Sequence, residues 1–162
     1  MPRTARALLE NACYHIINRG NQKQSIFLEK IDFEKYLELL KHYKRKYKFK
    51  LYAYCLMPNH IHLIIELRKT KDLAKIMQGI TQTYTIWFNK KYIKVGRLWQ
   101  NRFKSMLIQR DKYLLDCLKY IELNPVRAQM ASSPTNYLWS SWQERMFTNN
   151  SSCLLDTPEI IK

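Results

Sequence analysis

The stretch KLYAYCLMPNHIHLIIEL, residues 50–67, contains two apolar runs separated by Pro58 and Asn59. Proline and asparagine favour turns, so the runs predict two neighbouring antiparallel strands, one on each side of the turn. The second run alternates polar and apolar side chains at its start, which is typical of a strand with one face in the core.

The segments around the hairpin alternate between strand and helix patterns. We expect a strand at 12–18, helices at 32–47 and 72–91, a short strand at 104–109, and a last helix running from Asp111 to Leu123, before Pro125. The order β-α-β-β-α-β-α is the split βαβ, ferredoxin-like pattern with one added helix. The sequence therefore predicts an α+β fold with an antiparallel sheet and packed helices.

The size and charge of the chain limit the number of domains and the kinds of partner that we expect. Its 162 residues suit one domain, which we place at 1–145, with 146–162 as a loosely attached tail. Lys and Arg number 28 against 13 Asp and Glu, a formal net charge of +15. Such an excess favours a polyanionic partner, most often nucleic acid. A basic protein without such a partner is the alternative.

The compartment is predicted from features that the sequence lacks. It has no secretory signal pattern and no apolar run near the ~20 residues of a membrane span. The four cysteines are far apart and form no CxxC pair, so we expect reduced, packed thiols rather than a zinc site or disulfides. We therefore expect a cytoplasmic protein with no membrane partner.

His60 and His62 form a candidate metal-binding pair. Residues i and i+2 of a strand share a face, about 7 Å apart at a rise of ~3.4 Å per residue, so both imidazoles can reach one ion. Glu66 shares that face but lies too far along the strand to complete the same shell. A His-x-His pair on a strand can equally be structural, and the spacing alone leaves both readings open.

Tyr120 is a candidate nucleophile in the stretch YIELNP. On a helix it would stack with Asn124, four residues on, which pairs a phenol with an amide able to ligate a metal. A phenol is almost fully protonated at neutral pH, so attack on a phosphodiester needs nearby positive charge and a polarised phosphate. An ordinary helix aromatic remains the alternative reading.

Five stretches in one order resemble the REP-associated tyrosine transposases, relatives of the single-tyrosine insertion-sequence transposases in the HUH endonuclease superfamily. They are NRGN at 18–21, AYCLMPNHIHLII at 53–65, GRLWQNRFKS at 96–105, YIELNPVRA at 120–128 and WSS at 139–141. The resemblance covers about residues 10–145. It implies a ferredoxin-like core whose added C-terminal helix carries the nucleophile.

The resemblance also implies a function. Such enzymes cut and rejoin single-stranded DNA next to hairpin-forming repeats through a covalent 5′-phosphotyrosine. By the match of motifs, His60 and His62 hold a divalent metal, Mg²⁺ or Mn²⁺, and Tyr120 is the nucleophile. Asn124 matches a third metal ligand. Glu122 stands where family members commonly have His, so Glu122 is the alternative third ligand.

The expected partner is therefore single-stranded DNA with hairpin-forming repeats, and no small-molecule substrate. Cations interleaved with amides and an aromatic suit a splayed strand. The candidate DNA-binding residues are Asn18, Arg19, Asn21, Arg97, Trp99, Gln100, Arg102, Lys104 and Arg127. The repeat-associated group tends to be monomeric, so we expect a monomer rather than a homodimer.

Two other functions compete with the enzyme. One is a degenerate transposase that binds DNA as a repressor, which would be marked by loss of a histidine or of the tyrosine. The other is an RRM-like nucleic-acid-binding module, which expects a glycine- and aromatic-rich strand. The chain keeps both histidines and the tyrosine, and its three glycines form no such strand.

Overall fold

A computed structural model describes residues 9–109, 112–147 and 154–159 of the chain. The strands are β1 (Cys13–Arg19), β2 (Lys50–Met57), β3 (His60–Glu66) and β4 (Lys104–Ile108). The helices are α1 (Lys30–Tyr47), α2 (Asp72–Tyr92), α3 (Lys112–Glu122), α4 (Asn124–Arg127) and α5 (Ser141–Phe147), with short 3-10 turns at Asn21–Lys23 and Pro134–Asn136. This order confirms the predicted α+β pattern.

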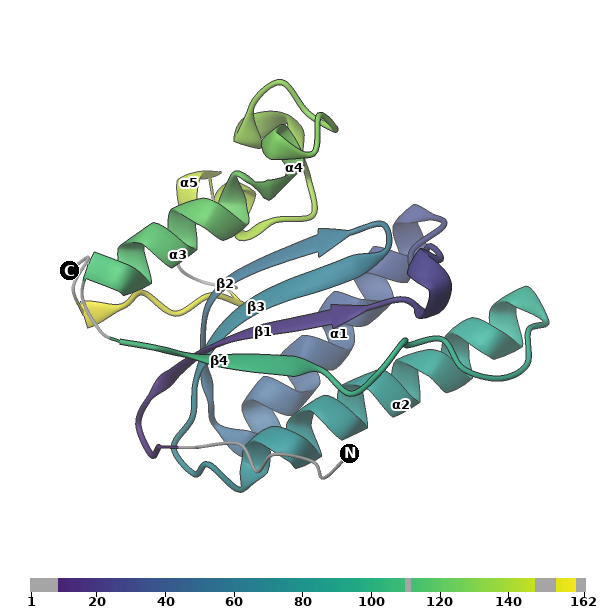
Figure 1. Cartoon of the computed structure of the whole chain (residues 1–162), viewed down its shortest axis with the longest axis horizontal. Coiled ribbons are helices and arrows are strands. Elements are labelled where there is room, and N and C mark those ends of the chain that lie inside the picture. Colours follow the sequence, from purple (N-terminus) through teal and green to yellow (C-terminus); the bar gives the residue numbers. More distant parts are fainter. Residues whose placement is uncertain (1–8, 110–111, 148–153, 160–162) are drawn as a thin grey trace.

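The four strands form one antiparallel sheet in the order β2-β3-β1-β4. The hairpin predicted around Pro58 and Asn59 is present, with Met57 and His60 as its last paired residues. Helices α1 and α2 cover one face of the sheet, and α3 crosses the other (Figure 1). The sheet is therefore the middle layer of three.

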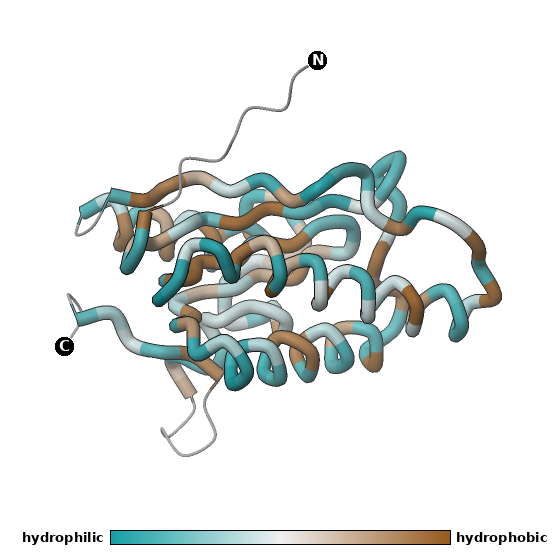
Figure 2. Tube along the Cα trace, turned by 90° about the horizontal axis from the view of Figure 1, so that it is seen from below, coloured by the Kyte–Doolittle hydropathy of each residue, from teal (hydrophilic) through white to brown (hydrophobic). Residues whose placement is uncertain are grey.

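The larger core lies between the sheet and the α1–α2 layer. Alternate strand residues such as Ile16, Ile61 and Leu63 pack there against apolar residues of both helices. The two helices run side by side along this face (Figure 2). Gly79 of α2 lies directly against the ring of Tyr43 of α1, where a Cβ atom would overlap the ring. Glycine at this position allows the helices to approach closely.

The second core lies under α3. Leu114, Leu118 and Ile121 of α3 pack onto Ile64 and Cys55 of the sheet, all of them buried. The spacing of the three helix residues is that of one helical face. The other positions of α3 can carry polar and reactive side chains.

The ends of two helices differ from their predicted positions. Helix α1 begins at Lys30 because Glu29 and Asp32 form a capping box, in which the Asp32 carboxylate accepts from the Glu29 backbone N–H at 2.9 Å. Helix α3 ends at Glu122, and the chain then starts the short α4, in which Pro125 occupies a first-turn position. The predicted cap Asp111 lies outside the described residues.

The segment predicted as a loose tail, 146–162, has two described parts: residues 146–147 end α5, and residues 154–159 lie beside β2. Asp156 donates its backbone N–H to the carbonyl of Leu51 at 2.7 Å and accepts the Leu51 N–H on its carboxylate at 2.9 Å. Lys44 forms an ion pair with the same carboxylate. These contacts lie along the outer edge of β2.

Of the described helices, none has the length and apolar character that crossing a bilayer requires.

Candidate active site

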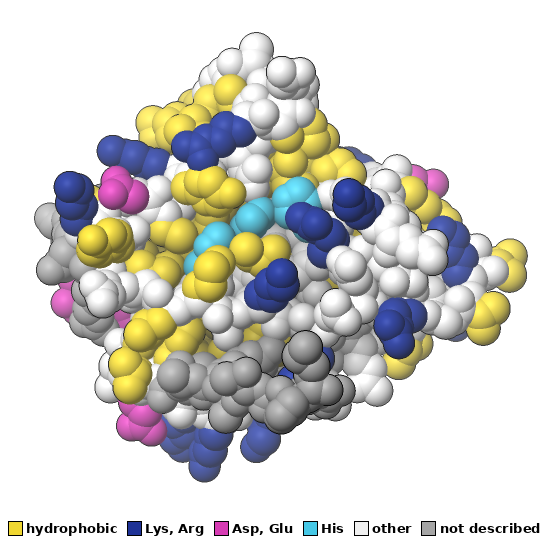
Figure 3. All heavy atoms as spheres, in the orientation of Figure 1, with side chains coloured by type: hydrophobic (Ala, Val, Ile, Leu, Met, Phe, Trp, Pro, Cys, Tyr) yellow, Lys and Arg dark blue, Asp and Glu magenta, His cyan; other side chains and the backbone are white. Residues whose placement is uncertain are grey.

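The hairpin and β1 bring three histidines onto the sheet face under α3. In the sheet register, His60 lies beside Arg19, and His62 lies beside Ile17. His15 is two residues from Ile17, so it shares that face. Ring centroids are 5.0 Å apart for His60 and His62, and 5.1 Å for His62 and His15. Figure 3 shows the histidine side chains as a continuous band with Lys and Arg beside it.

Hydrogen bonds orient the two histidines predicted to bind metal. Nδ1 of His62 lies 2.9 Å from Nε2 of His15, and Nδ1 of His60 lies 2.6 Å from the Oδ1 of Asn59. With the proton on Nδ1, each ring donates to its partner and keeps a lone pair on Nε2. Metal-binding histidines usually have this arrangement, in which one ring nitrogen donates a hydrogen bond and the other keeps a lone pair for the metal.

Burial keeps these imidazoles neutral. It lowers the pKa of His62 to about 3 and that of His15 to about 4. The pKa of His60 is also lowered, by burial and then by the charge of Arg19. Because a metal competes with a proton for the same lone pair, lowered pKa values leave the imidazoles in the form that binds metal.

Tyr120 of α3 lies above this band. Its ring centroid is 6.3 Å from that of His62 and 6.4 Å from that of His15. Tyr120 is 43% exposed, so it is accessible from solvent. The guanidinium carbon of Arg127 lies 4.7 Å from the centre of its ring. The predicted nucleophile therefore has two imidazoles and a cation beside it.

A break at Leu123 separates Asn124 from the helix that carries Tyr120. The N–H of Leu123 donates to the carbonyl of Lys119 at 2.9 Å, so the helical hydrogen bonding extends to that residue. Asn124 is the first residue of α4 and is partly buried. Because α3 ends two residues earlier, the stacking of Asn124 with Tyr120 stays a prediction.

Glu122, the alternative third ligand, points away from the histidines. Its buried carboxylate accepts from the Ser141 hydroxyl at 2.7 Å and from the Arg145 guanidinium at 3.0 Å. Two residues on a helix turn by about 200°, which places Glu122 opposite Tyr120. This correction assigns Glu122 to the attachment of α5.

The residues on this face fit a divalent ion only in part. The Nε2 atoms of His60 and His62 are suitable donors, and the amide oxygen of Asn124 stays the predicted third ligand. Within the described ranges, no group of three His, Cys, Asp or Glu side chains could hold a metal. The remainder of a coordination shell would come from water and a phosphate oxygen, as in catalytic sites that keep open positions.

The candidate DNA-binding residues divide between two places. Arg19, Lys104 and Arg127 surround the histidine band, because Lys104 pairs with Ile17 and so shares its face. The second group lies on the other face of the sheet, on the α2 side, and includes Asn18, Arg97, Trp99, Gln100 and Arg102. Asn21 follows the end of β1 and donates its N–H to the carbonyl of Leu98 at 2.8 Å, next to the second group.

The placement of Trp99 corrects its expected role in base stacking. Its side chain is only 9% exposed and belongs to the core between the sheet and the helices. The indole N–H is 3.0 Å from the hydroxyl of Thr85 and 3.3 Å from the carbonyl of Thr81. Trp99 therefore anchors its segment to α2.

Sequence reasoning missed His15 and the polar residues of α2. Nothing in CYHIINR shows that β1 will lie beside β3 with His15 next to His62, because that register depends on residues 47 positions apart. Gln78 and Thr81 lie one helical turn apart. This spacing can be read from the sequence, but it is equally typical of a solvated helix face.

Comparison with known proteins identifies the family. Residues 9–124 match the family described as IS200-like transposases. A Haemophilus influenzae protein named as a REP-associated tyrosine transposase is 34% identical in an alignment of 107 residues, which covers 59% of this chain and 60% of that protein. The alignment thus spans less than two thirds of that relative.

Solved structures share the fold. A REP-associated tyrosine transposase bound to a REP hairpin has a TM-score of 0.78 at 17% identity, covering 99% of this chain and 93% of that one. A Deinococcus radiodurans protein described as a transposase has a TM-score of 0.51 at 12% identity, covering 80% and 99%. The family match over more than half of its residues shows that this chain belongs to the IS200-like transposases, with REP-associated tyrosine transposases among its relatives.

Proposed function

We propose that the protein cleaves and rejoins single-stranded DNA beside hairpin-forming repeats, with Tyr120 as the nucleophile. The observation that carries the proposal is the position of the exposed Tyr120 ring over His62 and His15, with Arg127 against it. The relative bound to a REP hairpin supports a hairpin as the DNA partner.

Cleavage and rejoining each require one exchange of phosphodiester bonds. The Tyr120 oxygen attacks the phosphorus and loses its proton, the bond from phosphorus to the 3′ oxygen breaks, and that oxygen leaves as a 3′-OH. The product is a 5′-phosphotyrosine, and attack by another 3′-OH reverses the step and rejoins DNA. No external energy source is needed, because one phosphodiester is exchanged for another.

Arg19, Lys104 and Arg127 would hold the phosphates around the attacked bond, since each places a cation on or beside the histidine face. His60 and His62 would hold Mg²⁺ or Mn²⁺ through Nε2, with Asn124 as a further ligand. When bound, the ion would withdraw charge from a phosphate oxygen. Hydrogen bonds to His15 and Asn59 would hold the imidazoles of His62 and His60 with their Nε2 atoms free to bind the ion.

The test is the formation of a covalent adduct. The protein is incubated with hairpin oligonucleotides that carry randomised single-stranded flanks, with Mn²⁺ or with EDTA, and separated on a denaturing gel. We expect a DNA-linked protein band that requires Mn²⁺ and carries the label of the 5′-phosphate side only.

Two variants of α3 make the test specific. Tyr120→Phe removes the hydroxyl and should abolish the adduct. Tyr113→Phe is the matched control, because Tyr113 is also exposed on α3, at 63%, and should leave the adduct unchanged. An adduct that survives Tyr120→Phe would refute the assignment. Hairpin binding with no adduct under any condition would instead indicate a DNA-binding repressor.

A further inference from the structure

The loop between α2 and β4 presents an apolar tip to solvent. We define the tip as residues 93–97, IKVGR, all of which are exposed. The exposed fraction is 93% for Ile93 and 100% for Val95. Figure 1 shows the end of α2 and this loop projecting beyond the strands, at the end of the sheet where β1 stops and the β2–β3 hairpin turns, and Figure 2 shows hydrophobic residues there. Single exposed apolar side chains are common, but two on one projecting loop indicate a contact surface.

Hydrogen bonds within the loop hold the tip in one conformation. The N–H of Lys94 donates to the carbonyl of Asn89 at 2.9 Å, and the side-chain amide of Asn89 donates to the carbonyl of Gly96 at 3.0 Å. Ile93 has a φ of 52°, which is unfavourable for a β-branched residue, and its exposed side chain gains no packing in return. Strain that the folded protein does not compensate is typical of a residue that acts on a partner.

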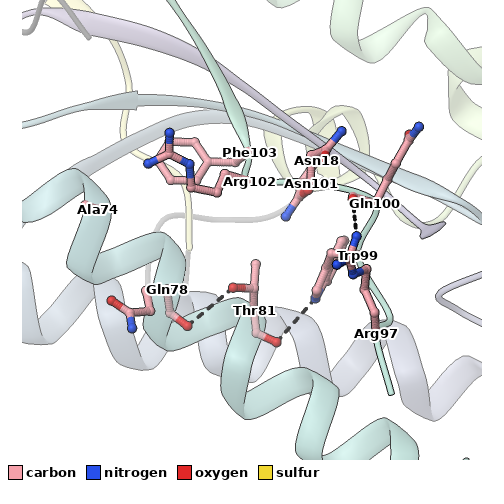
Figure 4. A pocket seen from close by; sticks show the side chains of 10 residues that line it. All are labelled: Asn18, Ala74, Gln78, Thr81, Arg97, Trp99, Gln100, Asn101, Arg102 and Phe103. Carbon is pink, nitrogen blue, oxygen red and sulfur yellow. Dashed lines mark hydrogen bonds between the residues drawn. The ribbon is translucent and has the colours of Figure 1, made fainter. Parts of the chain in front are cut away.

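The base of the tip is anchored next to the candidate active site. Trp99 forms a bridge with Gly20, the residue that follows β1. Its indole N–H also bonds to the carbonyl of Thr81 of α2 at 3.3 Å, beside a cavity of about 850 Å³ lined in part by side-chain amides (Figure 4). Val95 is four residues from Trp99, so their Cα atoms are at most ~14 Å apart. The tip is therefore within about 20 Å of the end of β1, or about six base-pair steps of a duplex at ~3.4 Å each.

The charge around the tip favours a polyanionic partner. Residues 73–109 include seven Lys and Arg and no Asp or Glu. Lys91 is paired with carboxylates at the start of α1, whereas Lys90, Lys94 and Arg97 form no ion pair within the described part of the chain. Cations beside exposed apolar side chains are typical of proteins that insert an apolar wedge between base pairs. The combination therefore favours DNA over an acidic peptide, which offers no stacked bases to separate.

We propose that Ile93 and Val95 form a wedge that inserts at the junction between the duplex stem of the hairpin and its single-stranded flank. The wedge keeps the flank unstacked from the stem, while Lys90 and Lys94 hold phosphates of the stem. The inference rests on the proposed function and deepens it, because it assigns strand separation to a surface outside the candidate active site. Unstacking costs less at such a junction than inside the stem, since the flanking base is already unpaired.

The fluorescence of 2-aminopurine, a base analogue that brightens when it unstacks, tests the wedge. Hairpin oligonucleotides carry the analogue either at the first flanking nucleotide or in the middle of the stem, and are titrated with protein in EDTA. We expect a rise at the junction and none within the stem. In the double variant Ile93→Asn/Val95→Asn the junction rise should be lost, and Kd should increase about 10-fold, the effect of leaving one apolar side chain unburied. A rise confined to the middle of the stem would overturn the proposal.

Two further variants separate the wedge from general effects. Leu138→Asn is the matched control, because Leu138 is 67% exposed and lies outside the tip, and it should keep the junction rise. Lys90→Gln/Lys94→Gln should lower the slope of log Kd against log salt by about 2, at about 0.9 for each lost phosphate contact. Ile93→Asn/Val95→Asn should leave that slope unchanged, since it removes no charge.

The remaining outcomes each count against one proposal or both. An undiminished junction rise in Ile93→Asn/Val95→Asn, or an equal loss in Leu138→Asn, refutes the wedge while the Tyr120 adduct still tests the enzyme. Absence of hairpin binding by the unmodified protein refutes both proposals. Sedimentation with anionic phospholipid vesicles that only the tip variant loses, with an unchanged junction rise, would assign the tip to a membrane surface instead.

Discussion

His62 and His60 belong to one short motif, yet they occupy different environments. His62 is 5% exposed and is bonded to His15, whereas His60 is partly exposed and is bonded to its neighbour Asn59. The orientation of His60 is therefore set locally. That of His62 depends on another strand, and this difference can be tested by substitution.

We expect His15→Leu to weaken Mn²⁺ binding by about 10- to 100-fold, the usual effect of removing a group that orients a metal-binding histidine. Leucine keeps the position apolar and removes the Nε2 that bonds to His62. Isothermal titration calorimetry without DNA measures the affinity. His42→Leu is the control, since His42 is exposed on α1, on the other side of the sheet. Equal affinities in the two variants would show that His15 does not orient His62.

Glu122→Ala should lower the free energy of unfolding and leave the affinity for Mn²⁺ nearly unchanged. The substitution leaves Arg145 and Ser141 without their carboxylate partner, so the free energy of unfolding should fall by about 3 kcal/mol. Mn²⁺ affinity of the folded variant should change less than about 2-fold, because Glu122 lies on the opposite side of α3 from Tyr120. Urea unfolding and calorimetry measure the two quantities. A large loss of Mn²⁺ affinity would restore Glu122 as a ligand.

Helix α2 is capped by a residue, Ile93, that has an unfavourable backbone conformation. Ile93 is the C-cap, with φ 52° and ψ 46°, and its side chain is 93% exposed. A β-branched residue in the left-handed region is strained, and asparagine tolerates that region better. Because the Ile93 side chain is exposed, packing offers no compensation for the strain.

Ile93→Asn should therefore raise the free energy of unfolding by about 1 kcal/mol, since it relieves strain and removes no packing. Val95→Asn is the matched control, because Val95 is fully exposed and has no positive φ. That control should change stability by less than about 0.5 kcal/mol. Urea unfolding of both variants provides the measurement, and a stabilisation common to both would point to lost surface hydrophobicity instead.

Over the whole molecule, the buried histidines make stability depend on pH. Burial lowers the pKa of His15 to about 4 and of His62 to about 3, from an ordinary 6.5. Below about pH 6.5 the unfolded chain binds protons that the folded chain does not. Stability should therefore rise with pH across this window and should be lost as the pH falls toward 4.

The metal-free protein should lose about 1 kcal/mol of unfolding free energy per buried histidine between about pH 7.5 and 5.5. Urea unfolding in EDTA at a series of pH values measures this loss. His15→Leu should show about half of it, because His62 still titrates in the unfolded state. A pH dependence identical to that of the unmodified protein would show that His15 is not held neutral.

Much of the fold follows from local pattern. The strand and helix order, the hairpin at Pro58 and Asn59, and the shared face of His60 and His62 depend on neighbours within a few residues. Alternation and helical spacing in the sequence reflect this short-range geometry, so these three features can be predicted from the sequence alone. The Tyr120 assignment needed the family resemblance as well, since a helix aromatic has no signature of its own.

Other features of the site exist only in the folded chain. The register of β1 against β3 sets His15 beside His62, and the packing of α2 against residues 97–103 forms the amide-lined cavity. Burial of Trp99 and the turning of Glu122 toward Arg145 likewise depend on partners far along the sequence. These contacts are chosen by the packing of the whole core, and local periodicity carries no information about which distant residues will meet.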